Sequence, residues 1–290
     1  MSSEDKVDRY SLLPPRLAAR AREALRRVQD QQGIEEPFIQ KQLLPTWKES
    51  YRVIPNDYAR SAIFTVRNKR AARRTFLNAP IFVLGKSQIA FTGIELRAAD
   101  DELVWLQMVN IAKGEALGSW VEFTPYEICK ALSWSTSAFY YERLHRSLLR
   151  LKASSVTIDS KNIGRVKAIH MLDAYEWKDA DDQKLARRRI KLNESLAILF
   201  AGSRYTQVEW GSYRQLSPVA RRIYDYVASH RKPYPPRLES LYAMCDSDCC
   251  HFPRWRQKVA SALKELRQLS LVDGHIYGNL VLFNRELSSN

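Results

Sequence analysis

A short helix, a tight turn and a longer helix that runs into strand-like residues occur twice in this 290-residue sequence. The first copy begins at Thr124, Pro125 and Glu127, which provide an N-cap, a proline at the first helical position and a capping box. The longer helix follows at about 136–153, and a predicted hairpin covers 154–177. Helix, turn, helix and hairpin in this order indicate the winged-helix form of helix-turn-helix.

The longer helix of the first copy has two faces of different chemistry. Leu144, Leu148 and Leu151 repeat at the helical period and predict the face that packs on a core. Aromatic and basic side chains cover the remainder, which suits contacts with base edges and phosphates, although a solvated basic helix has the same composition. The predicted DNA-contacting residues of this helix are Ser137, Tyr140, Tyr141, Arg143, His145, Arg146 and Arg150.

The second copy repeats the plan near the C-terminus. A short helix at 235–245, a turn, a longer helix at 254–270 and a hairpin with a turn at Asp273 and Gly274 are predicted. Two such modules in one chain can occupy successive major grooves of one DNA site, and each raises the effective concentration of the other. The predicted DNA-contacting residues of the second helix are Arg254, Trp255, Arg256, Gln257 and Lys258.

The sequence therefore predicts an α+β protein with two tandem winged-helix domains and a flexible or helical N-terminal extension. Residues 1–56 are expected to hold an amphipathic helix, which ends at Gly33, and a proline-containing linker. The first winged-helix domain is expected at 57–195 and the second at 196–290.

The charge balance indicates a polyanionic partner. Lys and Arg total 46 against 32 Asp and Glu, a formal net charge of +14, which attracts nucleic acid or an acidic membrane. No apolar run is long enough to cross a membrane, no signal-peptide core is present, and four cysteines fit a reducing cytoplasm. Two basic runs are predicted to contact the DNA backbone: Arg67, Lys69, Arg70, Arg73 and Arg74, and Arg187, Arg188 and Arg189.

Cofactor and metal sites are not expected. The run 85–87, Gly-Lys-Ser, resembles the end of a phosphate-binding loop, but Pro80 stands where that loop needs glycine. A zinc site needs a standard pair of ligand spacings, and none exists, so a loop with adjacent thiols is the preferred interpretation of Cys245, Cys249, Cys250 and His251. A nicking relaxase with a tyrosine nucleophile would need a histidine pair for its metal, which the sequence lacks.

Several stretches resemble the TrfA-type plasmid replication initiators, in the same order along the chain. Among them are LPTWKESYRVIPN at 44–56, WLQMVNIAKGEALG at 105–118, ERLHRSLLRLKA at 142–153, RYTQVEW at 204–210 and WRQKVASALKEL at 255–266. The resemblance covers about 42–267, and many short matches in order are more specific than any single motif.

The resemblance implies a function without enzymatic activity. Such initiators bind direct repeats (iterons) at a plasmid origin, open an adjacent AT-rich element, and recruit the host initiator, replicative helicase and sliding clamp. Their active form is taken to be a monomer, with dimers as an inactive pool. A clamp-binding segment is expected at Gln42, Leu43 and Leu44, whereas the similar run 268–272 is interpreted as structural.

A transcriptional repressor with the same fold is the alternative function. It would need neither origin opening nor helicase recruitment.

Overall fold

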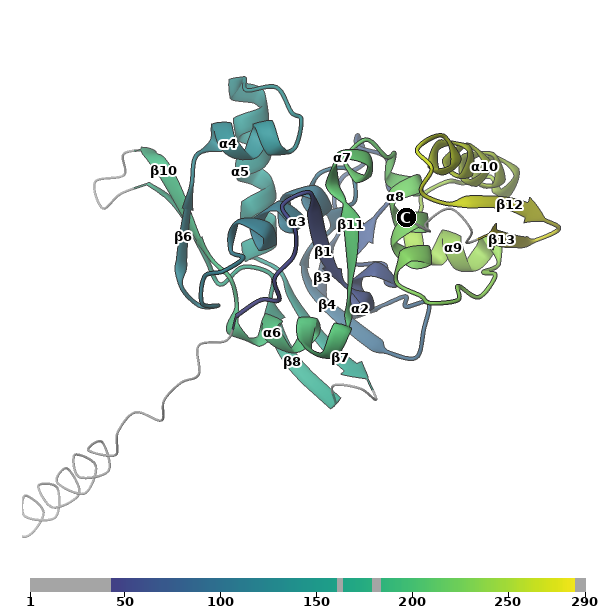
Figure 1. Cartoon of the computed structure of the whole chain (residues 1–290), viewed down its shortest axis with the longest axis horizontal. Helices are drawn as coiled ribbons and strands as arrows, with labels where there is room; N and C mark the ends of the chain where they lie inside the picture. Colours follow the sequence, from purple (N-terminus) through teal and green to yellow (C-terminus); the bar gives the residue numbers. More distant parts are fainter. Residues whose placement is uncertain (1–42, 161–163, 179–183, 285–290) are drawn as a thin grey trace, which may run out of the picture. The chain divides into compact units, whose positions relative to one another are not determined.

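The described part of the chain comprises two winged-helix modules and the sheets that join them. The computed structural model describes residues 43–160, 164–178 and 184–284 (Figure 1). The chain divides into two units, 1–41 and 42–290, and all described residues belong to the second. The predicted N-terminal helix and the first part of the predicted linker lie outside the described residues.

The first module is a winged helix whose three-stranded sheet has the order β6–β10–β9. Its first helix precedes β6, the helix-turn-helix pair follows β6, and the wing is formed by β9 and β10. In chain order the elements are α3 (Asp101–Ile111), β6 (Trp120–Phe123), α4 (Pro125–Ala131), α5 (Ala138–Lys152), β9 (Ala174–Lys178) and β10 (Lys184–Lys191).

The start of α4 confirms the predicted capping box. The Thr124 hydroxyl accepts a hydrogen bond from the Glu127 backbone N–H at 3.2 Å, and the Glu127 carboxylate accepts one from the Thr124 backbone N–H at 2.7 Å. The hydrogen bonds that the Thr124 backbone N–H and side chain make with the Glu127 carboxylate lower the pKa of Glu127. The cap fixes where α4 begins, and with it the direction of the turn into α5.

The second module repeats the arrangement with fewer residues, and its helices and hairpin lie together in Figure 1. An isolated bridge between Arg237 and Leu280 takes the place that β6 has in the first module. The predicted turn at Asp273 and Gly274 is wrong, because both lie in a strand and the hairpin turns at Gly278, where φ is +55°. The elements are α8 (Pro218–Ala228), α9 (Leu238–Cys245), α10 (Phe252–Gln268), β12 (Asp273–Tyr277) and β13 (Leu280–Asn284).

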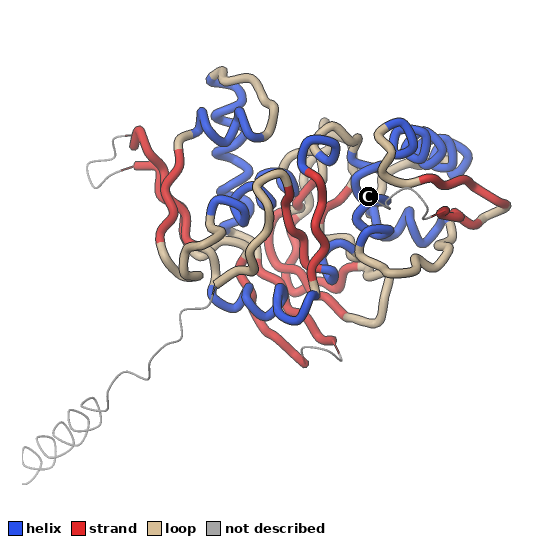
Figure 2. Tube along the Cα trace, in the orientation of Figure 1, coloured by secondary structure: helices blue, strands red, loops and turns tan. Residues whose placement is uncertain are grey.

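The region 154–177, predicted as a two-stranded hairpin, holds three strands among its described residues, because β8 (Gly164–His170) ends before the wing strand β9 begins at Ala174. The hairpin that directly follows α5 is not the wing. It consists of β7 (Ser155–Ser160) and β8, which extend a four-stranded sheet of order β3–β4–β7–β8 with β3 (Thr75–Ile81) and β4 (Gln88–Ile94). Figure 2 shows these four strands in red. The hairpin is thus inserted between the recognition helix and the wing, and the sequence prediction is corrected on this point.

Residues expected to form a linker are partly buried in the fold. Strand β1 (Tyr51–Pro55) pairs antiparallel with β11 (Tyr205–Glu209), and Val53 and Ile54 have no exposed surface. Trp47 is also buried, and its indole N–H donates to the Asn110 side chain. The prediction of a linker is therefore wrong for the described residues up to 56.

The remaining short elements connect the modules to the sheets. Strands β2 and β5 pair in parallel. These elements are α2 (Asn56–Ala59), β2 (Phe64–Thr65), β5 (Leu96–Arg97), the 3-10 turns η1 (Glu194–Leu196) and η2 (Ala201–Ser203), α6 (Ala197–Phe200) and α7 (Trp210–Tyr213).

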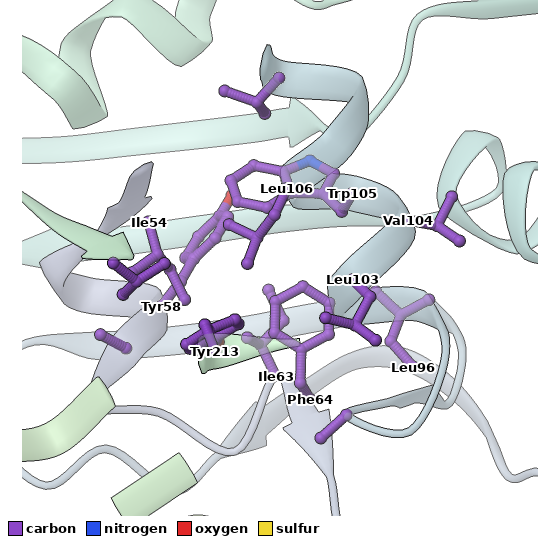
Figure 3. Close-up of a cluster of buried hydrophobic side chains, with 14 of the residues drawn as sticks. Ile54, Tyr58, Ile63, Phe64, Leu96, Leu103, Val104, Trp105, Leu106 and Tyr213 are labelled. Atoms are coloured by element: carbon purple, nitrogen blue, oxygen red, sulfur yellow. The ribbon is translucent and has the colours of Figure 1, made fainter. Parts of the chain in front are cut away.

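Helix α3 lies at the centre of the core. Every residue from Asp101 to Asn110 is buried, so this helix is covered on all sides. Trp105 packs against Tyr58 and Phe64, with ring centroids 5.3 and 6.2 Å away (Figure 3). The first helix of the first module is therefore the element on which the rest of the fold packs.

A buried ion network joins α3 to α8. The Arg222 guanidinium donates to Glu102 at 2.6 Å and to Asp225 at 2.7 Å, and none of the three side chains is exposed. Burial and the neighbouring Glu102 raise the pKa of Asp225 well above its usual range. Arg222 also donates to the carbonyls of Tyr58, Ala59 and Ser61, which satisfies its second nitrogen.

No helix among the described residues is long and apolar enough to span a membrane.

Candidate nucleic-acid interface

The outward row of α5 consists of Phe139, Glu142 and Arg146. The inward row, which includes Leu144 and Leu148, is buried. Phe139 is 71% exposed, and the Glu142 and Arg146 side chains are 53% and 69% exposed. The Arg146 guanidinium donates to the Glu142 carboxylate at 2.7 Å. The sequence analysis identified only Arg146 of this row, although the leucine period places Phe139 and Glu142 opposite the core.

Ser137 occupies the N-cap position of α5 and is exposed. Its side chain accepts no hydrogen bond from the first turn. The hydroxyl is therefore available to a ligand at this end of the helix, and its predicted contact with DNA stays a prediction.

The two predicted tyrosines and the histidine of α5 pack partly against the protein. Tyr140 and Tyr141 are half-buried against the core, and the Tyr140 ring lies 5.8 Å from that of Trp134. His145 lies 3.1 Å from the Tyr175 hydroxyl on β9, measured from Nδ1. These contacts position α5 against the turn and the wing, and contact of the three residues with DNA stays a prediction.

The two inner arginines of α5 are used to attach the helix to the N-terminus of α3. Arg150 donates to the Asp101 carboxylate at 2.7 Å and keeps only 13% of its side chain exposed. The Arg143 guanidinium lies 4.5 Å from the centroid of the Trp134 ring and 3.8 Å from the Asp100 carboxylate. Both guanidinium groups therefore help to hold the helix in place, and their predicted contact with DNA stays a prediction.

The acidic pair at the start of α3 is the anchor of this network. Asp101 is fully buried and also accepts hydrogen bonds from Ser147 at 2.6 Å and Arg73 at 2.6 Å. Burial and the charge of Asp100 raise the pKa of Asp101. Burial also opposes ionisation of Asp100, but the charges of Arg73, Arg150 and Arg143 outweigh it and lower the pKa of Asp100.

In the first predicted basic run, 67–74, two of the five predicted cations are exposed. Arg73 pairs with the Asp100 and Asp101 carboxylates, Arg74 with Glu95 and Asp246, and Arg67 with Glu95. Only Lys69 and Arg70 of this run are exposed. The prediction that the whole run contacts the DNA backbone is corrected, because three of its arginines neutralise buried or half-buried carboxylates.

The second predicted basic run lies on wing strand β10, where side chains alternate between the two faces. Arg187 pairs with Glu122 at 3.0 Å, and Arg189 pairs with Glu176 at 2.7 Å. Arg188 points to the other face and donates to the Tyr175 hydroxyl at 2.9 Å. Arg187 remains 56% exposed and Arg189 42%, so both can still exchange a surface carboxylate for a phosphate.

Helix α10 presents a more polar and less neutralised face. Arg254 and Gln257 are exposed and Lys258 is half-buried, while Arg256 donates to the Gly278 carbonyl of the hairpin turn at 2.6 Å. The prediction that Trp255 contacts DNA is wrong. Its side chain is fully buried, and its indole N–H donates to the Leu238 carbonyl at 2.9 Å.

A groove of about 730 Å³ lies between α10 and strand β12. Arg267 lines it and pairs with Asp273 at 2.6 Å, and Lys264 lines it without an ion-pair partner among the described residues. The sequence analysis missed Lys264. Its position two turns after Gln257 on the outward face would have identified it. The groove residues are Arg256, Gln257, Ala260, Leu263, Lys264, Arg267, Gln268, Gly274, His275 and Ile276.

The predicted clamp-binding segment is partly inaccessible. Leu44 is 3% exposed, so the prediction that it enters a partner is wrong. Leu43 is 59% exposed and pairs with Ala116 through an isolated bridge. Gln42 lies outside the described residues.

The loop after α9 carries the clustered thiols. Cys245 and Cys249 are buried and Cys250 is exposed. Burial raises the pKa of the Cys245 thiol to about 12, which makes it a poor metal ligand or nucleophile at neutral pH.

Comparison with known proteins identifies the family of the chain. A family model described as TrfA protein matches residues 15–285. The plasmid replication initiator protein TrfA of Escherichia coli is 40% identical over 243 residues, which cover 83% of this chain and 63% of that relative. The matched part of the chain thus spans less than two thirds of the length of this curated relative.

Among solved structures, the Pi initiator protein in complex with iteron DNA matches with a TM-score of 0.50 and 12% identity, over 83% of this chain and 100% of that one. Domains 2–3 of RctB match with a TM-score of 0.48 and 11% identity, over 75% and 92% of the two chains. At this identity the match to Pi concerns the fold. Because the family model covers nearly all of the sequence, the chain belongs to the TrfA protein family.

Proposed function

We propose that this chain is a plasmid replication initiator that binds direct repeats on duplex DNA through its two winged-helix modules. The observation that carries this proposal is the pair of helix-turn-helix units, each with an exposed outward row, in a chain of the TrfA family. The relative that is 40% identical is a plasmid replication initiator, and the Pi initiator of similar fold was solved with iteron DNA. The net charge of +14 supplies the general attraction to phosphates.

The two modules are proposed to divide one repeat between them. The first, within 57–195, places the N-terminal half of α5 in a major groove and lays β9 and β10 against the adjacent backbone. The second, within 196–290, does the same with α10 and β12–β13. Since the modules are connected, binding of one raises the effective concentration of the other at the next groove.

The later steps of initiation are proposed from family membership. They comprise opening of an AT-rich element, contact with single-stranded DNA there, and recruitment of the host initiator, helicase and sliding clamp, all without a catalytic site in this chain. The monomer is the proposed active form, and a homodimer the inactive one. Of the predicted clamp-binding residues, Leu43 is the described one that is exposed.

A footprint on the origin region of the encoding plasmid tests this function, at about 150 mM salt because phosphate contacts weaken steeply with salt. Wild type should protect evenly spaced repeats. Arg146→Ala and Arg254→Ala should each weaken protection, in different halves of each repeat. A single protected operator without repeats would instead indicate a repressor, and protection no better than on random DNA would contradict sequence-specific binding altogether.

A further inference from the structure

Phe139 is the most exposed large apolar side chain on either recognition helix in the part of the chain that the structure describes. Its exposed fraction is 71%, against 41% for Phe252 at the start of α10. Covering this ring with an apolar group of a ligand would remove apolar surface from water, which is favourable, so the ring is available for an apolar contact. It lies in the first turn of α5, the part of a recognition helix that contacts base edges.

The ring of Phe139 is held in an outward position. It meets the Tyr140 ring edge-on, with an interplanar angle of 87° and centroids 5.3 Å apart. Tyr140 is itself fixed against Trp134. Edge-to-face pairs of this kind limit ring motion, so little rotamer entropy is lost when Phe139 binds a ligand.

The neighbours of Phe139 on the outward row are charged. Glu142 and Arg146 follow at the spacing of one and two helical turns and form an ion pair with each other. A single apolar ring with charged neighbours fits a ligand that has one small apolar group among polar groups. The ring alone is too small to bind the apolar core of a protein interface. A stacking platform for single strands would need cations along the backbone path, whereas Glu142 places a carboxylate there.

The floor of the major groove offers one apolar group, the 5-methyl of thymine. We propose that Phe139 contacts a thymine 5-methyl group and thereby sets a thymine preference in the half-site that α5 reads. This inference rests on the proposed function. On the same row, Arg146 can donate hydrogen bonds to a guanine, and Glu142 can accept one from a cytosine, next to that thymine.

The second module makes the assignment specific to α5. Leu144, Leu148 and Leu151 correspond in spacing to Val259, Leu263 and Leu266, a shift that places Arg254 at the position of Phe139. The Arg254 guanidinium can donate hydrogen bonds to guanine or phosphate, but it is not an apolar partner for a thymine methyl group. The affinity should therefore depend on a thymine methyl group in the half-site that α5 contacts and not in the half-site that α10 contacts.

The test measures the effect of removing only the methyl group. Wild-type protein first selects its preferred duplex from a random library, and each thymine of the enriched duplex is then replaced by deoxyuridine. Loss of one buried methyl group should weaken wild-type binding about fourfold at one or two positions. Phe139→Ala should bind the thymine duplex at least about fivefold more weakly and lose the deoxyuridine effect at those positions alone. Phe139→Leu should retain part of it.

Leu77→Ala is the matched control, because Leu77 is 86% exposed on β3 and lies outside both recognition helices. It should bind every duplex as wild type does. A deoxyuridine effect that persists in Phe139→Ala, or no such effect in the α5 half-site, would overturn the thymine contact while leaving the proposed function intact. So would a Phe139→Ala defect confined to single-stranded DNA. If wild type enriches no common sequence, the proposed function fails, and the thymine contact with it.

Discussion

The two recognition helices are held in place by different interactions. Helix α5 is attached through charges, since Arg143 and Arg150 are bound to the acidic pair at the start of α3. Helix α10 is attached through an aromatic side chain, Trp255, which is buried and hydrogen-bonded to the carbonyl of Leu238. The comparison shows that the number of arginines on a helix does not give the net charge of its exposed face, because some of these arginines are paired with carboxylates inside the protein. After internal pairing, α10 is the more cationic of the two outward faces.

The largest expected effect is on the aromatic attachment of α10. Trp255→Ala should lower the free energy of unfolding by about 3–5 kcal/mol, because it removes a fully buried ring and leaves a cavity. Denaturant unfolding measures this loss. Phe139→Ala is the control, since an exposed ring should contribute less than about 0.5 kcal/mol. Equal losses for the two variants would mean that Phe139 also supports the fold.

The charged attachment of α5 should be weaker but substantial. Asp101→Ala should cost about 2–3 kcal/mol of unfolding free energy, because Arg73, Arg150 and Ser147 lose a buried acceptor while Asp100 remains nearby. Asp273→Ala, which removes the half-buried partner of the exposed Arg267 side chain, should cost much less, because an ion pair with an exposed partner contributes little. The same unfolding assay applies, and an Asp101→Ala protein as stable as wild type would remove the distinction between anchor and surface pair.

Salt dependence should separate the two faces. Arg254→Ala and Lys264→Ala should each reduce the slope of log K against log salt by about one, because both cations are exposed and have no ion-pair partner among the described residues. Arg150→Gln should leave this slope unchanged, since its charge is already neutralised by Asp101. Titrations of one duplex at several salt concentrations measure the slopes. A reduced slope for Arg150→Gln would show that its ion pair opens on DNA.

The smallest expected effect concerns the wing of the second module. The hydrogen bond from Arg267 lowers the pKa of Asp273. A lowered pKa means that the folded state favours the carboxylate, so this contribution to stability is present above the ordinary pKa and disappears as the pH falls through the lowered value. Wild type should therefore lose slightly more stability than Asp273→Asn between pH 6 and pH 3. Parallel curves for the two proteins would contradict this assignment.

The sequence predicted those elements whose signals are local. The capping box at Thr124, the leucine periods and the two helix-turn-helix units are set by neighbouring residues, and the structure confirms them. The wing was misassigned because β7 and β8 have the same alternating pattern as β9 and β10. Only pairing with β6, far earlier in the chain, distinguishes the true wing.

The candidate interface was harder to predict because burial and ion pairing are tertiary properties. Tryptophan is a residue type that can stack on bases, and only the fold shows that Trp255 instead faces Leu238. Arg73 and Arg150 look like phosphate ligands until Asp101 is placed between them. The exposure of Phe139 could have been predicted from the sequence, because the leucine period alone places this residue on the outward row.

The buried contact of Arg222 with Glu102 and Asp225 has a consequence for the DNA rather than for the protein. It joins the first helices of both modules, and parting them would leave the buried Glu102 carboxylate without Arg222 while Arg222 and Asp225 stay paired on α8. The two recognition helices are therefore expected to keep one mutual orientation. Each base pair inserted between the half-sites turns one of them by about 34° around the duplex axis. Repeats for this protein should thus tolerate base changes in their centre far better than changes in length.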